Sequence, residues 1–251
     1  MSYITADNVS LDLPIIGAAR SFRSHLLVNK VGGLLRVGSK AENEIVKVQA
    51  LKDLTFRLER GDRLGLIGHN GAGKSTLLRV LAGTYRPTSG SLKIKGNVMP
   101  LLSLGSGMDG DFTGYDNIML YGLYLGLSRQ QIAARTREIA DFTELGDFLS
   151  LPIRTYSAGM LLRLSFAVAT SMDPEILLVD EIFGAGDASF YVKAKHRMET
   201  MLEKSSILVL ATHSVSLITD YCNKTGVMQK GQMAFFGPTA EAIEYYKKHI
   251  L

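Results

Sequence analysis

The most constraining feature of the sequence is a glycine-rich stretch from Gly68 to Ser75, which has the sequence GHNGAGKS. It fits the P-loop pattern G-x-x-x-x-G-K-[ST]. The short run Arg63–Ile67 before it predicts a strand, and Thr76–Ala82 after it predicts a helix, which is the context this pattern requires. Glycines let successive backbone N–H groups converge on a polyphosphate, and a helix N-terminus adds the positive end of its dipole. The stretch therefore predicts a phosphate-binding loop.

The side chains of this loop predict a nucleoside triphosphate with magnesium as the ligand. Lys74 would neutralise charge on the β- and γ-phosphates, and the Ser75 hydroxyl would ligate Mg²⁺. The other candidate contacts to the nucleotide are Gly68, His69, Asn70, Gly71, Ala72, Gly73 and Thr76. The alternative is a glycine-rich turn without a ligand, and the flanking strand and helix argue against it.

Composition sets broad limits on the class of protein. The 251 residues suffice for one large domain or two small ones. No run of about eighteen apolar residues predicts a membrane span, and the N-terminus lacks the features of a secretion signal. The single cysteine, Cys222, fits a reducing cytoplasm. The net charge of +4 permits contact with an anionic membrane surface or nucleic acid and requires neither.

A basic segment interrupts the predicted strands near the N-terminus. From Pro14 to Ala41 there are five basic residues and no acidic one. The five are Arg20, Arg23, Lys30, Arg36 and Lys40. We expect an insertion over residues 14–45, and two interpretations stay open. It lies against a membrane interface or a partner's surface, or it is a solvated loop with a short surface helix.

The rest of the chain predicts an α/β core with a helical insertion. Strands are expected at residues 2–13, 45–51, 54–58 and 91–95, buried strands at 176–180 and 207–211, and a hairpin over 227–236. Helical periodicity appears at 116–125, 128–142 and 157–171, with Ser128 and Ser157 as N-caps. These three helices form an insertion within about residues 97–172. Further helices are expected at 190–202 and within the last segment, 239–251.

Two polar patterns follow the buried strands, where α/β folds place ligands. Asp180 and Glu181 end one strand, so that one carboxylate can hold magnesium, partly through water, while the next polarises the attacking water. His213 follows the next strand and can hydrogen-bond a γ-phosphate. The alternatives are a helix-capping acid pair and a structural histidine, and the P-loop upstream favours the catalytic interpretation.

A third pattern, Tyr156-Ser157-Ala158-Gly159-Met160, opens a helix, and Gly184-Ala185-Gly186-Asp187 forms a fourth. Together with the P-loop, Asp180-Glu181 and His213, these motifs resemble those of the ATP-binding-cassette (ABC) ATPases over essentially residues 2–238. Alone, the two patterns would be a helix cap and a turn. The resemblance implies a single nucleotide-binding domain with a P-loop NTPase core, an antiparallel β subdomain and an inserted α-helical subdomain.

The resemblance also implies roles and a partner copy. ATP and Mg²⁺ would be the cofactors, Glu181 the general base, and Lys74 and His213 the groups that stabilise phosphate charge. Two copies would pair head to tail, with the P-loop of one facing Ser157 and Gly159 of the other, while Asp187 crosses the interface. A serine and a glycine at a helix N-terminus suit a γ-phosphate.

A narrower resemblance points to one branch of this family. Its residues are Leu104–Met108, Phe112–Asn117, Tyr156–Met160 with Arg163-Leu164, and Gly184–Asp187. They are similar to the ATPase subunits of bacterial exporters for O-antigen, capsule and teichoic-acid polysaccharides. That branch implies ATP-driven export of a lipid-linked glycan through a separate polytopic membrane permease, with the ATPase peripheral at the cytoplasmic face of the inner membrane and no nucleic-acid partner.

Three departures from the family pattern stand out. No glutamine occurs from Asn97 to Thr113, and Ser103 or a neighbour stands where the Q-loop glutamine is expected. Leu13 replaces the adenine-stacking aromatic, with Phe22 as a candidate substitute. After the last helix we expect no carbohydrate-binding domain, which some polysaccharide exporters carry.

Three other functions stay open at this point. The first is an ABC ATPase that moves a different substrate, and the branch motifs argue against it. The second is a soluble ABC protein acting on ribosomes or DNA, which usually has two cassettes or a coiled-coil insertion. The third is a phosphate-binding module without hydrolysis, which the presence of Asp180, Glu181 and His213 argues against.

Overall fold

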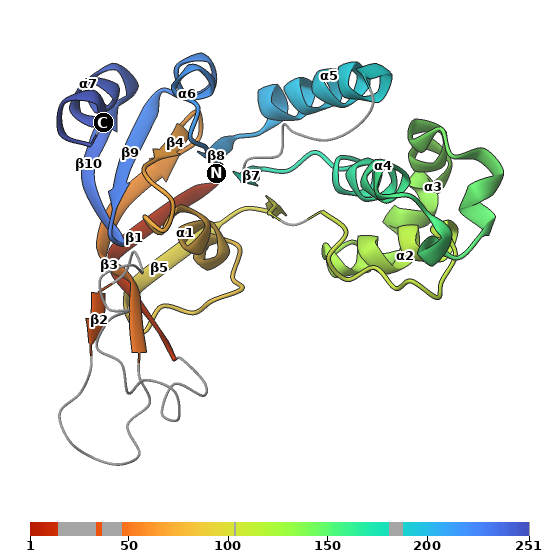
Figure 1. Ribbon diagram of the computed structural model, residues 1–251, viewed down its shortest axis with the longest axis horizontal. Helices are drawn as coiled ribbons and strands as arrows, with labels where there is room; N and C mark the ends of the chain where they lie inside the picture. The colour runs from red at the N-terminus through yellow and green to blue at the C-terminus, as the bar shows by residue number, and fades with distance from the viewer. Residues whose placement is uncertain (15–33, 37–46, 103, 181–187, 251) are drawn as a thin grey trace, which may run out of the picture. The chain divides into compact units, whose positions relative to one another are not determined.

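The computed structural model describes residues 1–14, 34–36, 47–102, 104–180 and 188–250, and these form two compact units (Figure 1). The sheet unit comprises Met1–Pro100, Glu175–Glu181 and Ser206–Leu251. The helical unit comprises Leu101–Pro174 and Ile182–Ser205.

An antiparallel sheet of four strands forms one layer of the sheet unit, as expected. Its order is β2-β3-β1-β5, with β1 at Tyr3–Pro14, β2 at Leu34–Arg36, β3 at Lys47–Glu59 and β5 at Ser89–Lys95. The sequence predicts two strands, at 45–51 and 54–58, but the structure has the single strand β3. The break expected between them is a bulge at Asp53, whose φ of 50° is left-handed and whose N–H donates to Ser10 Oγ at 2.9 Å.

A six-stranded sheet forms the second layer, with the order β10-β9-β4-β8-β7-β6. Its strands are β4 (Arg63–Ile67), β6 (Val98–Leu101), β7 (Ile176–Asp180), β8 (Ile207–Ala211), β9 (Lys224–Gln229) and β10 (Gln232–Pro238). Neighbours among β9, β4, β8 and β7 are parallel, and β10 closes the predicted antiparallel hairpin with β9. The apolar residues of β7 and β8 are buried, which explains their unbroken apolar runs.

Three helices cover this sheet within the sheet unit. They are α1 (Lys74–Leu81), α6 (Val215–Tyr221) and α7 (Thr239–His249). α1 packs against β7 and β8, α6 against β4, and α7 against β9 and β10 (Figure 1). α1 and α7 confirm the prediction. The sequence did not predict α6 or β6, because seven and four residues show too little periodicity and β6 contains Pro100.

The helical unit contains α2 (Gly114–Tyr124), α3 (Arg129–Thr143), α4 (Ala158–Ala169) and α5 (Ala188–Lys204), with the short turns η2 (Gly146–Ser150) and η3 (Ile153–Thr155). Ser128 and Ser157 cap α3 and α4 as predicted. Thr113 caps α2 in a capping box with Asp116. α5 follows a core strand in sequence but belongs to this unit, because Phe190 packs with Phe142 of α3 and Phe166 of α4.

The basic segment falls largely outside the described residues. Pro14 ends β1, and residues 34–36 form β2 beside β3, with Leu34 opposite Gln49. Its contact with a membrane or a partner therefore stays a prediction. Among the helices of the described residues, none combines the length and apolarity needed to cross a bilayer.

Candidate nucleotide site

Sheet topology brings three of the predicted site segments to one edge. β8 lies between β4 and β7, with Leu66 and Asp180 both in register with Ala211. The P-loop leaves β4 directly after Ile67, Asp180 ends β7, and His213 follows β8. All three segments therefore leave the sheet at its carboxyl edge, where parallel α/β sheets bind ligands.

The glycines of the P-loop are required by close contacts as well as by backbone conformation. A Cβ on Gly68 would lie 2.2 Å from the Met228 carbonyl oxygen of β9, which no side chain tolerates. Gly71 and Gly73 have φ of 76° and 104°, the left-handed region that favours glycine. The loop thus folds back against the sheet edge and enters α1 at Lys74.

Gly231, in the turn between β9 and β10, supports the P-loop from outside. Its N–H donates to the Ala72 carbonyl at 2.9 Å, and its own carbonyl accepts from the Lys52 N–H at 2.9 Å. A Cβ on Gly231 would lie 2.6 Å from the Ala50 carbonyl oxygen. Sequence reasoning found the Lys230-Gly231 turn and missed its contact with the loop, because a turn signature carries no information about what packs on it.

Lys74 points back into its own loop. The side chain is only 7% exposed, and its Nζ donates to the carbonyls of Gly68 at 2.7 Å and His69 at 3.2 Å. Nζ also lies 3.4 Å from His213 Nε2. A buried ammonium needs hydrogen-bond acceptors. Here the backbone oxygens of Gly68 and His69, at the start of the P-loop, accept its hydrogen bonds. Lys74 and His213, which come from different strand ends, therefore lie together.

The N-terminus of α1 has no side-chain cap, a feature that it shares with α7 among the described α-helices. Side-chain oxygens of Thr113, Ser128, Ser157 and Ser214 cap α2, α3, α4 and α6. At α1 the N-cap is Gly73, which provides no side-chain acceptor, and the first turn has no acidic residue. Backbone N–H groups of the first turn, a helix dipole and a buried lysine converge here, and this combination suits an anionic phosphate.

The remaining P-loop residues surround Lys74 and differ in their exposure to solvent. His69 and Asn70 are exposed, Ala72 is buried, and Ser75 and Thr76 are half-buried. His69 Nε2 lies 3.0 Å from the Ile250 carbonyl after α7. Ser75 offers a hydroxyl and half-buried Asp180 a carboxylate, both oxygen donors of the kind that Mg²⁺ prefers. These residues fit a magnesium-bound nucleotide.

Ser157 and Gly159 lie in the helical unit at the exposed start of α4. Ser157 Oγ accepts from the Met160 N–H at 3.2 Å, and Ser157, Ala158 and Gly159 are all exposed. A Cβ on Gly159 would meet only Ser157 Oγ, at 3.8 Å. Tyr156, just before the helix, is anchored by a hydrogen bond from its Oη to the Phe148 carbonyl at 2.7 Å, and burial raises its pKa.

Several predicted positions lie outside the described residues. They are Glu181, Asp187, Ser103 and Phe22. Their roles stay predictions. Leu13 is described, and it lies half-buried in β1 opposite Val48 of β3.

Solved structures of the same fold confirm the expected architecture. A structure described as the ATP-binding subunit of an ABC transporter matches with a TM-score of 0.68 and 21% identity, covering 97% of this chain and 93% of the other. The dimeric post-hydrolysis structure of the ATP-binding cassette MJ0796 bound to ADP and Pi matches with a TM-score of 0.66 and 17% identity, covering 94% and 98%. These likenesses show the P-loop ABC fold.

Sequence comparisons show the family to which the chain belongs. The family model described as ABC transporter matches residues 51–184. The chain is 48% identical to the O-antigen export system ATP-binding protein RfbE of Yersinia enterocolitica, over 92% of this chain and 96% of that protein. It is 39% identical to the O-antigen export protein RfbB of Myxococcus xanthus and 35% to the teichoic acids export protein TagH of Bacillus anthracis, spanning 53% and 36% of their lengths. The chain therefore belongs to the ABC transporter family.

Proposed function

We propose that this chain is the ATP-hydrolysing subunit of an exporter that drives a lipid-linked bacterial surface polysaccharide across the inner membrane. Relatives named for O-antigen and teichoic-acid export support this substrate class. The subunit would work as a pair of copies with a separate polytopic permease, peripheral at the cytoplasmic face of that membrane. The main structural support for the proposal is the buried Lys74 ammonium, which lies beside His213 and at a helix N-terminus that has no side-chain cap.

Each residue of the candidate site has its own role in ATP hydrolysis. Lys74 and the α1 N–H groups bind the β- and γ-phosphates, and His213 beside Lys74 holds the γ-phosphate. Glu181, directly after β7, accepts a proton from the attacking water. Ser75 and Asp180 would hold Mg²⁺, which would neutralise negative charge on the phosphates.

A second copy would complete the site from the exposed start of α4. Ser157, Ala158 and Gly159 offer helix N–H groups and a hydroxyl with no side chain above Gly159. Such a surface fits a γ-phosphate presented by another protein molecule. The head-to-tail pairing inferred from the family motifs is therefore compatible with the accessibility of this helix start.

The base role of Glu181 is tested by Glu181→Gln, which keeps the side chain's size and removes its basicity. We expect ATP turnover to fall at least about 100-fold and an ATP-bound dimer to accumulate in light scattering with Mg·ATP. Glu203→Gln removes the same charge from an exposed position on α5 and serves as the control. Undiminished turnover by Glu181→Gln, assayed with the permease, would remove Glu181 from the base role.

The substrate class is tested in a strain that lacks this gene. We expect surface polysaccharide to disappear and its lipid-linked polymer to accumulate inside the cell, as measured by surface staining and lipid extraction. Wild type and Lys95→Ala, an exposed change on β5, should restore export, whereas Lys74→Ala should not. Normal surface polysaccharide in the deletion strain would contradict the proposal and favour another transported substrate or a target such as ribosomes.

A further inference from the structure

Glu144 ends helix α3 in a backbone conformation that disfavours its residue type. It is the C-cap, with φ of 57° and ψ of 26°, in the left-handed region. That conformation is disfavoured for a residue with a Cβ, and helices usually place glycine or asparagine there. A disfavoured backbone conformation persists where surrounding contacts hold the residue in place.

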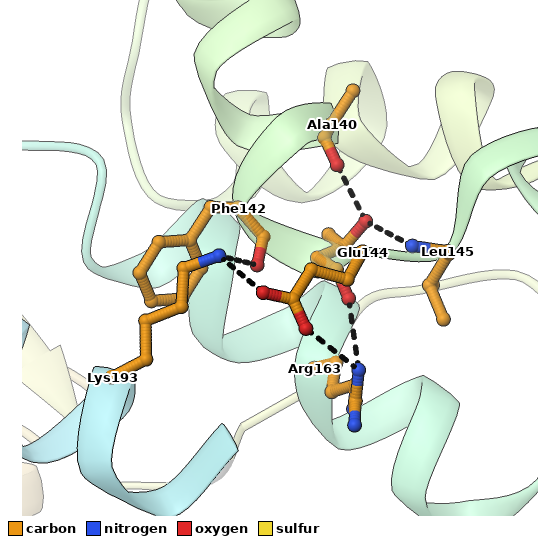
Figure 2. A network of polar contacts seen from close by, with 7 residues as sticks. Ala140, Phe142, Glu144, Leu145, Arg163 and Lys193 are labelled. Carbon is orange, nitrogen blue, oxygen red and sulfur yellow. Dashed lines mark hydrogen bonds and ion pairs between the residues drawn. The ribbon is translucent and has the colours of Figure 1, made fainter. Parts of the chain in front are cut away.

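Those contacts join three helices at one point, which Figure 2 shows. Lys193 Nζ of α5 lies 2.9 Å from Glu144 Oε1, and Arg163 Nη1 of α4 lies 3.5 Å from Glu144 Oε2. We call Glu144, Arg163 and Lys193 the three-helix junction. The two carboxylate oxygens thus each pair with a cation from a different helix.

The same two cations also complete the C-terminus of α3. Lys193 Nζ donates to the Phe142 carbonyl at 3.1 Å, and Arg163 Nη1 to the Thr143 carbonyl at 3.5 Å (Figure 2). The last turn of α3 has no basic residue of its own. The positive charge that stabilises a helix C-terminus is therefore supplied by α4 and α5.

Aromatic rings pack against the two cations of the junction. Phe142, Phe166 and Phe190, one from each helix, lie with centroids 5.7 to 6.1 Å apart. Arg163 lies 5.0 Å above the Phe190 ring, and Lys193 4.7 Å above the Phe142 ring. The Arg163 side chain is 18% exposed, whereas those of Lys193 and Glu144 are 37% and 50% exposed, so water screens the ion pairs of the junction in part.

Arg197 extends this arrangement by one turn along α5. Its Nε donates to the Thr170 carbonyl, the C-cap of α4, at 3.1 Å, and its Nη2 lies 2.8 Å from Glu138 Oε1 of α3. Two cations one turn apart on α5, Lys193 and Arg197, therefore bind the ends of α3 and α4. A rotation or shift of α5 against α4 would break several charged contacts at once.

The junction includes the helix whose start the proposed function assigns to the second copy. Arg163 is in the second turn of α4, whose N-cap is Ser157, and Lys193 is in the second turn of α5. We propose that Glu144 is a positioning residue that fixes α4 and α5 to each other, so that the start of α4 at Ser157 meets the partner copy in a fixed orientation. This inference rests on the proposed function.

The test is Glu144→Gln, made in the Glu181→Gln protein so that ATP-bound dimers persist. Glutamine keeps the shape of the side chain and removes the charge that binds both cations. ATP affinity of the isolated subunit, measured with a fluorescent ATP analogue, should stay within about twofold because the P-loop lies in the sheet unit. The dissociation constant of the ATP-bound dimer, measured by sedimentation, should rise at least about tenfold.

Two controls separate positioning from a loss of stability. Glu203→Gln removes an equal charge from exposed α5 and should leave the dimer unchanged. Thr113→Ala removes the capping hydroxyl of α2 in the same unit, and it lowers the melting temperature without touching the junction. At matched loss of melting temperature, Glu144→Gln should weaken the dimer far more than Thr113→Ala does.

A double-mutant cycle provides the last measurement. If Glu144 acts through Lys193, the effects of Glu144→Gln and Lys193→Met on dimerisation should be less than additive. Unchanged dimerisation in Glu144→Gln, or equal weakening in Thr113→Ala, would overturn the positioning role and leave the proposed function intact. Failure of the Glu181→Gln parent to dimerise with ATP would overturn both.

Discussion

At the scale of single residues, Cys222 shows how tightly α6 is packed on the core. The thiol is buried, and a Cβ on Gly65 of β4 would lie 3.2 Å from its Sγ and 2.8 Å from Ile218 Cδ1. Burial raises the pKa of the thiol to about 12, although the nearby charge of Arg63 lowers it in part. A thiolate is therefore disfavoured in the folded protein at any physiological pH.

This pKa predicts a pH dependence of stability. The unfolded thiol ionises above its ordinary pKa of 9.0, whereas the folded thiol keeps its proton until about pH 12. The contribution of this thiol to the free energy of unfolding therefore keeps its full value below pH 9. Between pH 9 and pH 12 it falls by about 1.4 kcal/mol per pH unit, because only the unfolded thiol loses its proton there. Urea unfolding should show a steeper fall in this range for wild type than for Cys222→Ala. Parallel pH profiles would contradict the prediction.

At the scale of elements, local signals were sufficient for most of the fold. Unbroken apolar runs predicted β7 and β8, and Ser128 and Ser157 marked the starts of α3 and α4. The sequence also placed His213 and Asp180 at strand ends, where parallel sheets bind ligands, and both positions lie at one edge of the sheet. These predictions succeeded because period, capping and sheet topology are properties of short segments.

Other elements depend on contacts between distant segments. Gly231 supports Ala72 of the P-loop, yet its turn signature predicts only a hairpin. Glu144 joins α4 and α5, but a charged residue after a helix has the same appearance in sequence as any solvated side chain. The assignment of α5 to the helical unit likewise follows from Phe190 and its ring partners, which no local pattern identifies.

At the scale of the whole molecule, the residues of the proposed site are divided between the two compact units. The P-loop, Asp180 and His213 belong to the sheet unit, whereas Ser157 and Gly159 belong to the helical unit. A pair of copies would form two sites. Each copy would contribute the P-loop half of one site from its sheet unit and the α4 half of the other site from its helical unit. Head-to-tail pairing requires that the two halves come from different copies, and this requirement can be tested by mixing variants.

Lys74→Ala disables the P-loop half, and Gly159→Asp places a negative charge at the start of α4, where open space accepts the side chain. Each variant alone should be inactive, because repulsion or a missing cation affects both sites of its dimer. An equal mixture should regain about a quarter of wild-type ATP turnover, since half of its dimers contain one intact site. A chain carrying both changes should stay inactive by itself. If the mixture is as inactive as the separate variants, the site is completed within one chain rather than between two.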